Sequence, residues 1–210
     1  EADAILSRRG IGISSDIERT IVPMFLGEMD GLGDSGAVVL LATNRPDILD
    51  PAVVREGRID RKVRVGRPSK QDAKSIFSLY IGKTRLASSV SVEPLALLAS
   101  DELFNNRRVF YEIKMRPTSG RKDIKFTLAH ICSGALIAGI VDQAISLAMH
   151  RDINNKSSDF SGVGEGDVVA AVDRVFDQNS DIDHEDAIKD LIYDFKNDVI
   201  DVFKLRQARA

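Results

Sequence analysis

The sequence predicts an α/β fold over its first 68 residues, followed by a mainly helical part that contains an inserted β-hairpin. Residues 37–42 form a short, uninterrupted apolar run between turn residues, as in a parallel-sheet strand that is buried on both faces. Apolar residues recur at helical spacing on both sides of this run. Further along, apolar and polar residues alternate over 109–115 and 124–128, which is typical of a hairpin.

Composition and charge exclude several classes of protein. The 210 residues carry 29 Lys and Arg against 32 Asp and Glu, so no overall positive charge attracts nucleic acid or anionic lipid. The longest apolar run is far shorter than the roughly 18 residues of a membrane span, and the first residues lack the positive stretch of a signal peptide. The single cysteine, Cys132, excludes an internal disulfide framework. We therefore expect one or two domains in a cytoplasmic protein, with no nucleic-acid or membrane partner.

The first predicted domain covers residues 1–68. It opens with a helix that begins at Ser15 and ends near Gly31, where glycines favour a stop. Pro23 lies inside this helix, so we expect a kink or a late start there. The strand over 37–42 follows, and a second, shorter strand is expected at 62–66.

The second predicted domain, residues 69–180, is mainly helical. Polar caps and apolar repeats of period 3.6 mark its helices, and period-two alternation marks the hairpin. The expected elements are a helix after Ser69, a helix over 92–100, a β-hairpin over about 108–128, a long helix opening at Ser133 and a helix over about 167–177.

Residues 181–210 are predicted to form a C-terminal helix. Five apolar residues there are separated by steps of four and three, the spacing of a narrow packing seam. They are Ile188, Ile192, Phe195, Val199 and Val202. The seam fits either a partner helix or the chain's own domain, and we favour the second.

No metal or nucleophile motif is present in the sequence. The three histidines, His130, His150 and His184, are at least twenty residues apart and lack the spacing of zinc ligands. Cys132 lies two residues from His130, but a lone cysteine in this position is usually structural. We expect no metal site within this chain.

The stretch from residue 42 to residue 68 carries the strongest chemical signal. Asn44 follows the first predicted strand, and ligands of open α/β sheets bind outside the carboxyl ends of strands. Arg55, Arg58 and Arg61 follow at three-residue spacing. Guanidinium groups match phosphate geometry, although neighbouring acids also fit a row of surface ion pairs. On charge pattern alone, the ion-pair reading is favoured.

Five segments in a fixed order change that balance. EADAI resembles the end of a Walker B motif, RTIVPMFLGEMDGL the helix after it, and LLATNRP a sensor-1 strand. ILDPAVVREGRIDR resembles an arginine-finger segment, and SGALIAGIVDQA a sensor-2 helix. Residues 1–145 thus resemble the C-terminal part of an AAA+ ATPase module, a P-loop NTPase with a parallel-sheet subdomain and a helical lid. SRRGIGISSDIERTIVP and the hairpin RRVFYEIKMRPTSGRKDIKF resemble the ARC-type ATPases of bacterial proteasomes.

The resemblance implies a role for each matching residue. Glu1 would be the Walker B glutamate that polarises the attacking water, and Asn44 the sensor-1 residue beside it. Arg55 and Arg58 would be arginine fingers that reach the ATP of a neighbouring subunit, with Arg61 in support or paired with an acid.

Two further segments also acquire roles by resemblance. Gly134 and Ala135 would let the lid backbone approach the nucleotide, because small side chains permit close contact. The loop over residues 9–16 would face a central pore. The implied cofactors are ATP and Mg²⁺ in the full-length protein.

The sequence also departs from the family pattern. No GxxxxGK[ST] phosphate loop occurs, and no aspartate precedes Glu1. We expect a chain that begins inside Walker B, holds two of five sheet strands and neither binds ATP tightly nor hydrolyses it. It stops at Arg209 and Ala210 without the penultimate tyrosine of ARC-type docking tails.

The resemblance implies a homo-oligomeric ring, expected to be a hexamer, that couples ATP hydrolysis to unfolding and translocation of a polypeptide substrate. A proteasome core particle is an implied partner. The alternative is a nucleotide-binding regulatory or scaffold ring without unfoldase activity. The hairpin region between Phe104 and Phe126 carries seven Lys and Arg against two acids, for which a solvated face or a subunit contact is favoured over nucleic acid.

Overall fold

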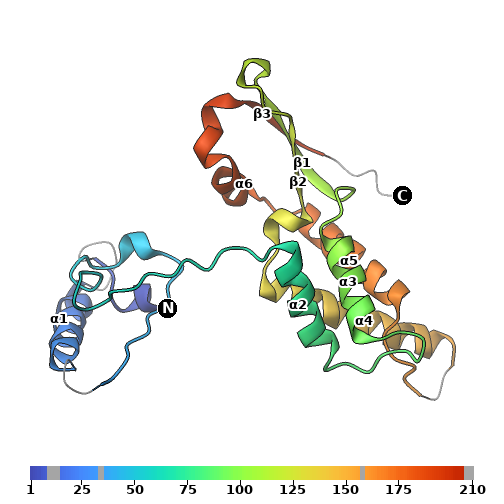
Figure 1. Ribbon diagram of the computed structural model, residues 1–210, viewed down its shortest axis with the longest axis horizontal. Helices are drawn as coiled ribbons and strands as arrows, with labels where there is room; N and C mark the ends of the chain where they lie inside the picture. The colour runs from blue at the N-terminus through green and yellow to red at the C-terminus, as the bar shows by residue number, and fades with distance from the viewer. Residues whose placement is uncertain (9–14, 33–35, 157–158, 206–210) are drawn as a thin grey trace. The chain divides into compact units, whose positions relative to one another are not determined.

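The computed structural model describes residues 1–8, 15–32, 36–156 and 159–205 (Figure 1). The chain divides into two compact units, Glu1–Val65 and Gly66–Ala210, which are described separately. Most of the expected pore-facing loop, residues 9–14, lies outside the described residues.

Unit 1 is built around helix α1, Ser15–Gly31, which runs through Pro23. The short 3-10 helices η1, Ala2–Ala4, and η2, Pro46–Ile48, accompany it. A small apolar core holds the unit together. Its buried members are Leu6, Val22, Leu49 and Val53.

The two strands predicted for unit 1 are not formed. Residues 37–42 and 62–66 are irregular, and Val38 and Leu40 are 91% and 92% exposed. A strand is stable only where its backbone groups pair with a neighbour. Within the described part of unit 1 the sole strand-like pairing is an isolated antiparallel bridge between Ser7 and Leu49. The apolar runs therefore have no sheet to join here.

Unit 2 contains the expected helices. Ser69 and Asp72 form a capping box at the start of α2, and the Ser133 side chain accepts the Leu136 N–H at 3.1 Å at the start of α4. These local signals confirm the predicted helix starts. The helices are α2 Lys70–Ile81, α3 Val92–Leu103, α4 Gly134–Asn154 and α5 Glu165–Ser180.

The predicted hairpin is present and belongs to a three-stranded antiparallel sheet of order β2–β1–β3. The strands are β1 Val109–Met115, β2 Ile124–Thr127 and β3 Val199–Lys204. Between β1 and β2 the chain turns through η3, Pro117–Ser119, and Gly120, whose φ of +69° favours glycine. The mixture of helices and a small sheet confirms the predicted fold class.

The prediction of a C-terminal helix over residues 181–210 is wrong for most of that range. Within its described part, residues 181–205, only α6, Glu185–Ile192, is α-helical, and η5, Tyr193–Asp198, leads into β3. The β-branched and aromatic run 199–203 instead pairs with the free edge of β1, because sheet pairing outweighs weak local helix preference.

The apolar seam of the tail packs on its own unit, as favoured above. Ile188 is buried in the core of unit 2, and the other seam residues are partly buried against it. The predicted spacing therefore located the contact surface correctly, although part of it lies on a strand.

An aromatic cluster joins the sheet to the tail of unit 2. Phe126 on β2 is fully buried, and its ring centroid lies 6.0 Å from that of Tyr111, 5.2 Å from His130 and 5.8 Å from His184. The His130 Nδ1 atom lies 3.0 Å from the Thr127 backbone nitrogen and accepts its hydrogen. Burial lowers the pKa of His130, because the charged ring is poorly solvated there.

The loop between α4 and α5 packs tightly against the segment before α3. Leu86 and Val163 form an isolated parallel bridge. At Gly162, where φ is +94°, an added Cβ would lie 2.3 Å from the Leu86 carbonyl carbon. Only glycine fits this crossing without backbone movement.

Candidate functional site

The segments that carry Glu1 and Asn44 lie side by side in unit 1. The Ala2 N–H donates to the Ala42 carbonyl at 2.8 Å, and the Thr43 hydroxyl donates to Asp3 Oδ1 at 2.6 Å. Both Glu1 and Asn44 are exposed, so their side chains are open to solvent. The structure thus places the segments that contain Glu1 and Asn44 next to each other, although more than forty positions separate them in the sequence.

The two predicted arginine fingers differ sharply in their surroundings. Arg58 Nε and Nη2 donate to the two carboxylate oxygens of Asp30 at 2.8 and 2.7 Å, and Nη1 donates to the Ala52 carbonyl at 2.8 Å. This pair raises the pKa of Arg58 and lowers that of the Asp30 carboxyl, chiefly through the hydrogen bonds. The Arg55 side chain is exposed and has no carboxylate partner among the described residues.

Asp30 was not singled out from the sequence. It lies near the end of α1, at the second-to-last residue, and ties that helix to the loop that carries both arginines. The available signal was the acid in GEMDGL, which directly precedes the glycine that ends the helix. A contact between residues 28 positions apart has no mark in local periodicity.

Gly134 and Ala135 occupy the first turn of α4 in unit 2. Ser133 caps Leu136, whereas no hydrogen-bond acceptor faces the Gly134 and Ala135 N–H groups within the described residues. An added Cβ at Gly134 would meet nothing within 4 Å, so the chain itself does not require glycine there. The first turn of this helix is therefore open for hydrogen bonding to an anion or a polar ligand.

The predicted site residues are divided between the two units. Glu1, Asn44, Arg55 and Arg58 lie in unit 1, and the α4 start lies in unit 2. In the described ranges, no group of three or more His, Cys, Asp or Glu side chains is arranged to hold a metal ion. Nor does any described helix combine the length and apolarity needed to cross a membrane.

Each unit thus offers groups of a kind that bind a nucleoside triphosphate. In unit 1 an exposed amide, and a guanidinium with no carboxylate partner among the described residues, can bind phosphate oxygens, and in unit 2 the helix N–H groups at the start of α4 can separately bind polar nucleotide atoms. Residues 1–67 match the model of the ATPase family associated with various cellular activities (AAA). This match covers about the first third of the chain and identifies residues 1–67 as part of an AAA ATPase domain.

Curated relatives extend the match through most of the chain. A protein of Corynebacterium kroppenstedtii, named "AAA ATPase forming ring-shaped complexes", is 37% identical over 193 residues, which cover 87% of this chain and 34% of the relative. Proteins of the same name in Corynebacterium efficiens and Bifidobacterium longum subsp. infantis are each 36% identical, over 87% and 75% of this chain and 33% and 30% of their own lengths. The chain spans about a third of the length of these relatives.

Proposed function

We propose that the protein is a subunit of an ATP-hydrolysing ring in which each active site is completed by an arginine of the neighbouring subunit. One observation carries this proposal: the Arg55 side chain is exposed and has no carboxylate partner among the described residues, on a loop that Arg58 fixes to α1. The relatives are named as ATPases that form ring-shaped complexes, and this supports assembly of the present protein into a ring.

Bound ATP, with Mg²⁺, would supply the phosphoryl group that is transferred to water. Glu1 and Asn44 would orient that water, since their segments are joined by backbone pairing. The first turn of α4 would hold polar atoms of the nucleotide. Arg55 would stabilise negative charge on the transferring phosphoryl group, an effect worth about 10³–10⁵ in turnover for arginine fingers.

Arg58 can act as an arginine finger only after it leaves its present partner. Its guanidinium is already engaged by both oxygens of Asp30, so it reaches a phosphate only by exchanging that carboxylate. We therefore propose that Arg58 first positions the loop and acts as a second finger after this exchange. Loss of Asp30 would then alter the placement of Arg55 as well.

The experiment compares substitutions in the full-length protein. Arg55→Ala should lower ATP turnover by about 10³-fold or more, while ATP binding and ring formation are retained. Arg64→Ala is the matched control, because Arg64 is exposed and lies outside the candidate site. An unchanged turnover for Arg55→Ala would refute the finger assignment.

Asp30→Ala should lower turnover less than Arg55→Ala, with the thermal stability of the ring little changed.

We further propose that hydrolysis drives unfolding and translocation of a polypeptide, with a proteasome core particle as a candidate recipient. The test is ATP-dependent loss of fluorescence from a tagged green fluorescent protein, with and without the core particle. A ring that hydrolyses ATP but leaves this substrate folded would instead support the regulatory or scaffold alternative.

The 210-residue chain by itself should not bind ATP tightly, because its sequence contains no GxxxxGK[ST] loop to hold the phosphates. Isothermal titration of the purified chain with Mg²⁺ and ATP should give no saturable heat at micromolar concentrations. A micromolar dissociation constant would contradict this prediction, and hydrolysis would contradict it more strongly.

A further inference from the structure

The turn of the hairpin carries positive charge that carboxylates of the described residues neutralise only in part. We call residues 116–125 the basic turn; it holds four Lys and Arg against one acid. Arg121 is engaged, since its guanidinium lies 4.8 Å above the Phe195 ring and 3.6 Å from Asp198. In the described part of the chain no carboxylate pairs with the other three cations, all of them exposed: Arg116, Lys122 and Lys125.

A surface of opposite charge lies on α6 and just before it in the same unit. We call Asp183, Asp186 and Asp190 the acidic face. Residues 181–190 contain five acids and one lysine, Lys189, which pairs with Glu185 at 2.7 Å and more distantly with Asp186 at 4.0 Å. The Asp186 side chain is fully exposed. Tyr193, directly after α6, is 75% exposed, and aromatic side chains are enriched at protein interfaces.

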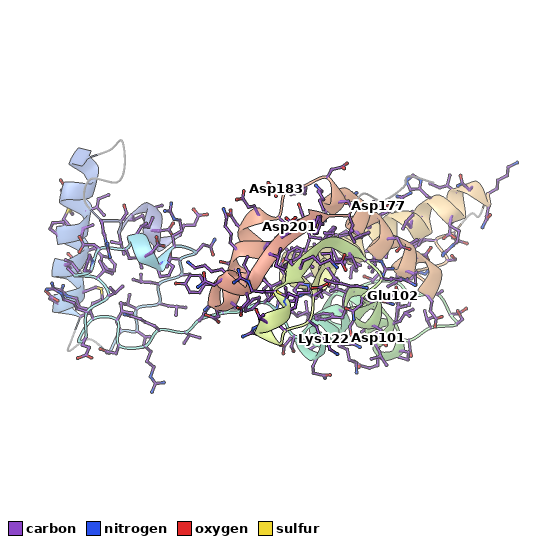
Figure 2. All side chains as sticks on the ribbon, turned by 90° about the horizontal axis from the view of Figure 1, so that it is seen from above. Asp101, Glu102, Lys122, Asp177, Asp183 and Asp201 are labelled. Atoms are coloured by element: carbon purple, nitrogen blue, oxygen red, sulfur yellow. The ribbon has the colours of Figure 1, made fainter. Side chains whose placement is uncertain are left out.

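The two surfaces do not face each other within one chain. In Figure 1 the hairpin turn stands at the end of the sheet away from helices α2 to α5. Figure 2 shows Lys122 and Asp183 on opposite sides of the unit. Charges on opposite sides of one subunit are satisfied by two neighbours rather than by one.

A ring of identical subunits needs this kind of asymmetry. In a closed ring each subunit contacts its neighbours through two different surfaces that are complementary to each other. We propose that the basic turn of one copy binds the acidic face of the next copy, as one of the contacts that close the ring. The inference rests on the proposed ring-forming function and specifies a surface through which copies meet.

A second copy fits the basic turn better than a nucleic acid does. The chain carries a net charge of −3, and the acidic face would repel a polyanion that approached the unit. A neighbouring subunit offers separate carboxylates on a folded surface, which suits the separate lysine and arginine side chains of the turn. Contacts between exposed charges are screened by salt, so the contribution should fade as ionic strength rises.

Charge reversal in the full-length protein tests this contact. Lys122→Glu alone and Asp186→Lys alone should each raise the concentration of half-assembly by about fivefold to tenfold at low salt. The double variant should return it to within about twofold of the original value, because the attraction is restored with reversed signs. Lys83→Glu makes the same charge change outside both surfaces and should leave assembly unchanged. Sedimentation velocity measures assembly of the original protein and of these four variants.

A disulfide experiment gives an independent measurement. The double variant Lys122→Cys with Asp186→Cys should form covalent dimers and higher ladders on mild oxidation, whereas each single variant should not form ladders. Native Cys132 does not interfere, because it is fully buried and burial raises its pKa to about 11.

The outcomes separate this inference from the proposed function. Single reversals that leave assembly unchanged overturn the contact, and Arg55-dependent hydrolysis in those rings would keep the proposed function. A protein that forms no ring at low or high salt overturns both. If Lys122→Glu abolishes binding of a fluorescent DNA duplex while assembly is unaffected, the basic turn is a nucleic-acid surface and the contact is refuted.

Discussion

Phe126 offers the sharpest test of how unit 2 is held together. Its side chain is 0% exposed, and its ring lies against Tyr111, His130 and His184. Phe126→Ala removes this buried ring and leaves a cavity, which typically costs about 3–5 kcal/mol of unfolding free energy. Phe203 on β3 is a matched control, since the same change there removes a side chain that is 47% exposed.

The expected shift in melting temperature follows from the size of the unit. Unit 2 has about 145 residues, so at about 2.1 cal/mol/K per residue its unfolding entropy is about 0.3 kcal/mol/K. Phe126→Ala should therefore lower the melting temperature of unit 2 by about 10–16 °C, and Phe203→Ala by about 3 °C. Differential scanning calorimetry of the 210-residue chain measures both. Equal shifts for the two variants would refute the packing derived for this cluster.

Two further predictions concern stability. Gly162→Ala should destabilise unit 2 by about 1–3 kcal/mol in urea unfolding, because a Cβ there meets the Leu86 backbone at a positive φ; Gly139→Ala inside α4 meets no such obstacle and should be neutral or stabilising. Because burial lowers the pKa of His130, the unfolded chain takes up this proton first as the pH falls through about 6.5, so the unfolding free energy should decrease there. His130→Gln should make the melting temperature depend less steeply on pH between about pH 7.5 and 5.5. A variant whose melting temperature falls as steeply as that of the original protein would show that His130 does not cause this pH dependence.

The sequence was most informative where structure is set by neighbours in the chain. The caps at Ser69 and Ser133 predicted the starts of α2 and α4, because a side-chain oxygen there accepts a backbone hydrogen three residues later. The alternation over 109–115 predicted β1 for a similar reason, since inward and outward faces alternate along a strand.

The errors arose where a distant segment decides the outcome. Residues 37–42 have the composition of a buried strand, but a strand also requires a paired neighbour, which composition does not report. In the tail, β1 offers an open edge to residues 199–204, and that pairing changed a predicted helix into β3. The contact between Asp30 and Arg58 was missed for the same reason. In the candidate site, the residue types and their order were readable, whereas the unequal accessibility of the two arginines was not.

The position of β3 has a consequence during protein synthesis. The central strand β1 is complete at Met115, yet one of its two neighbours does not begin until Val199. At about 5–20 residues per second, a ribosome would take on the order of 4–17 seconds to make the intervening chain. One edge of the hairpin is therefore unprotected in every nascent copy, and crowded polysomes would bring such edges together before the last strand emerges.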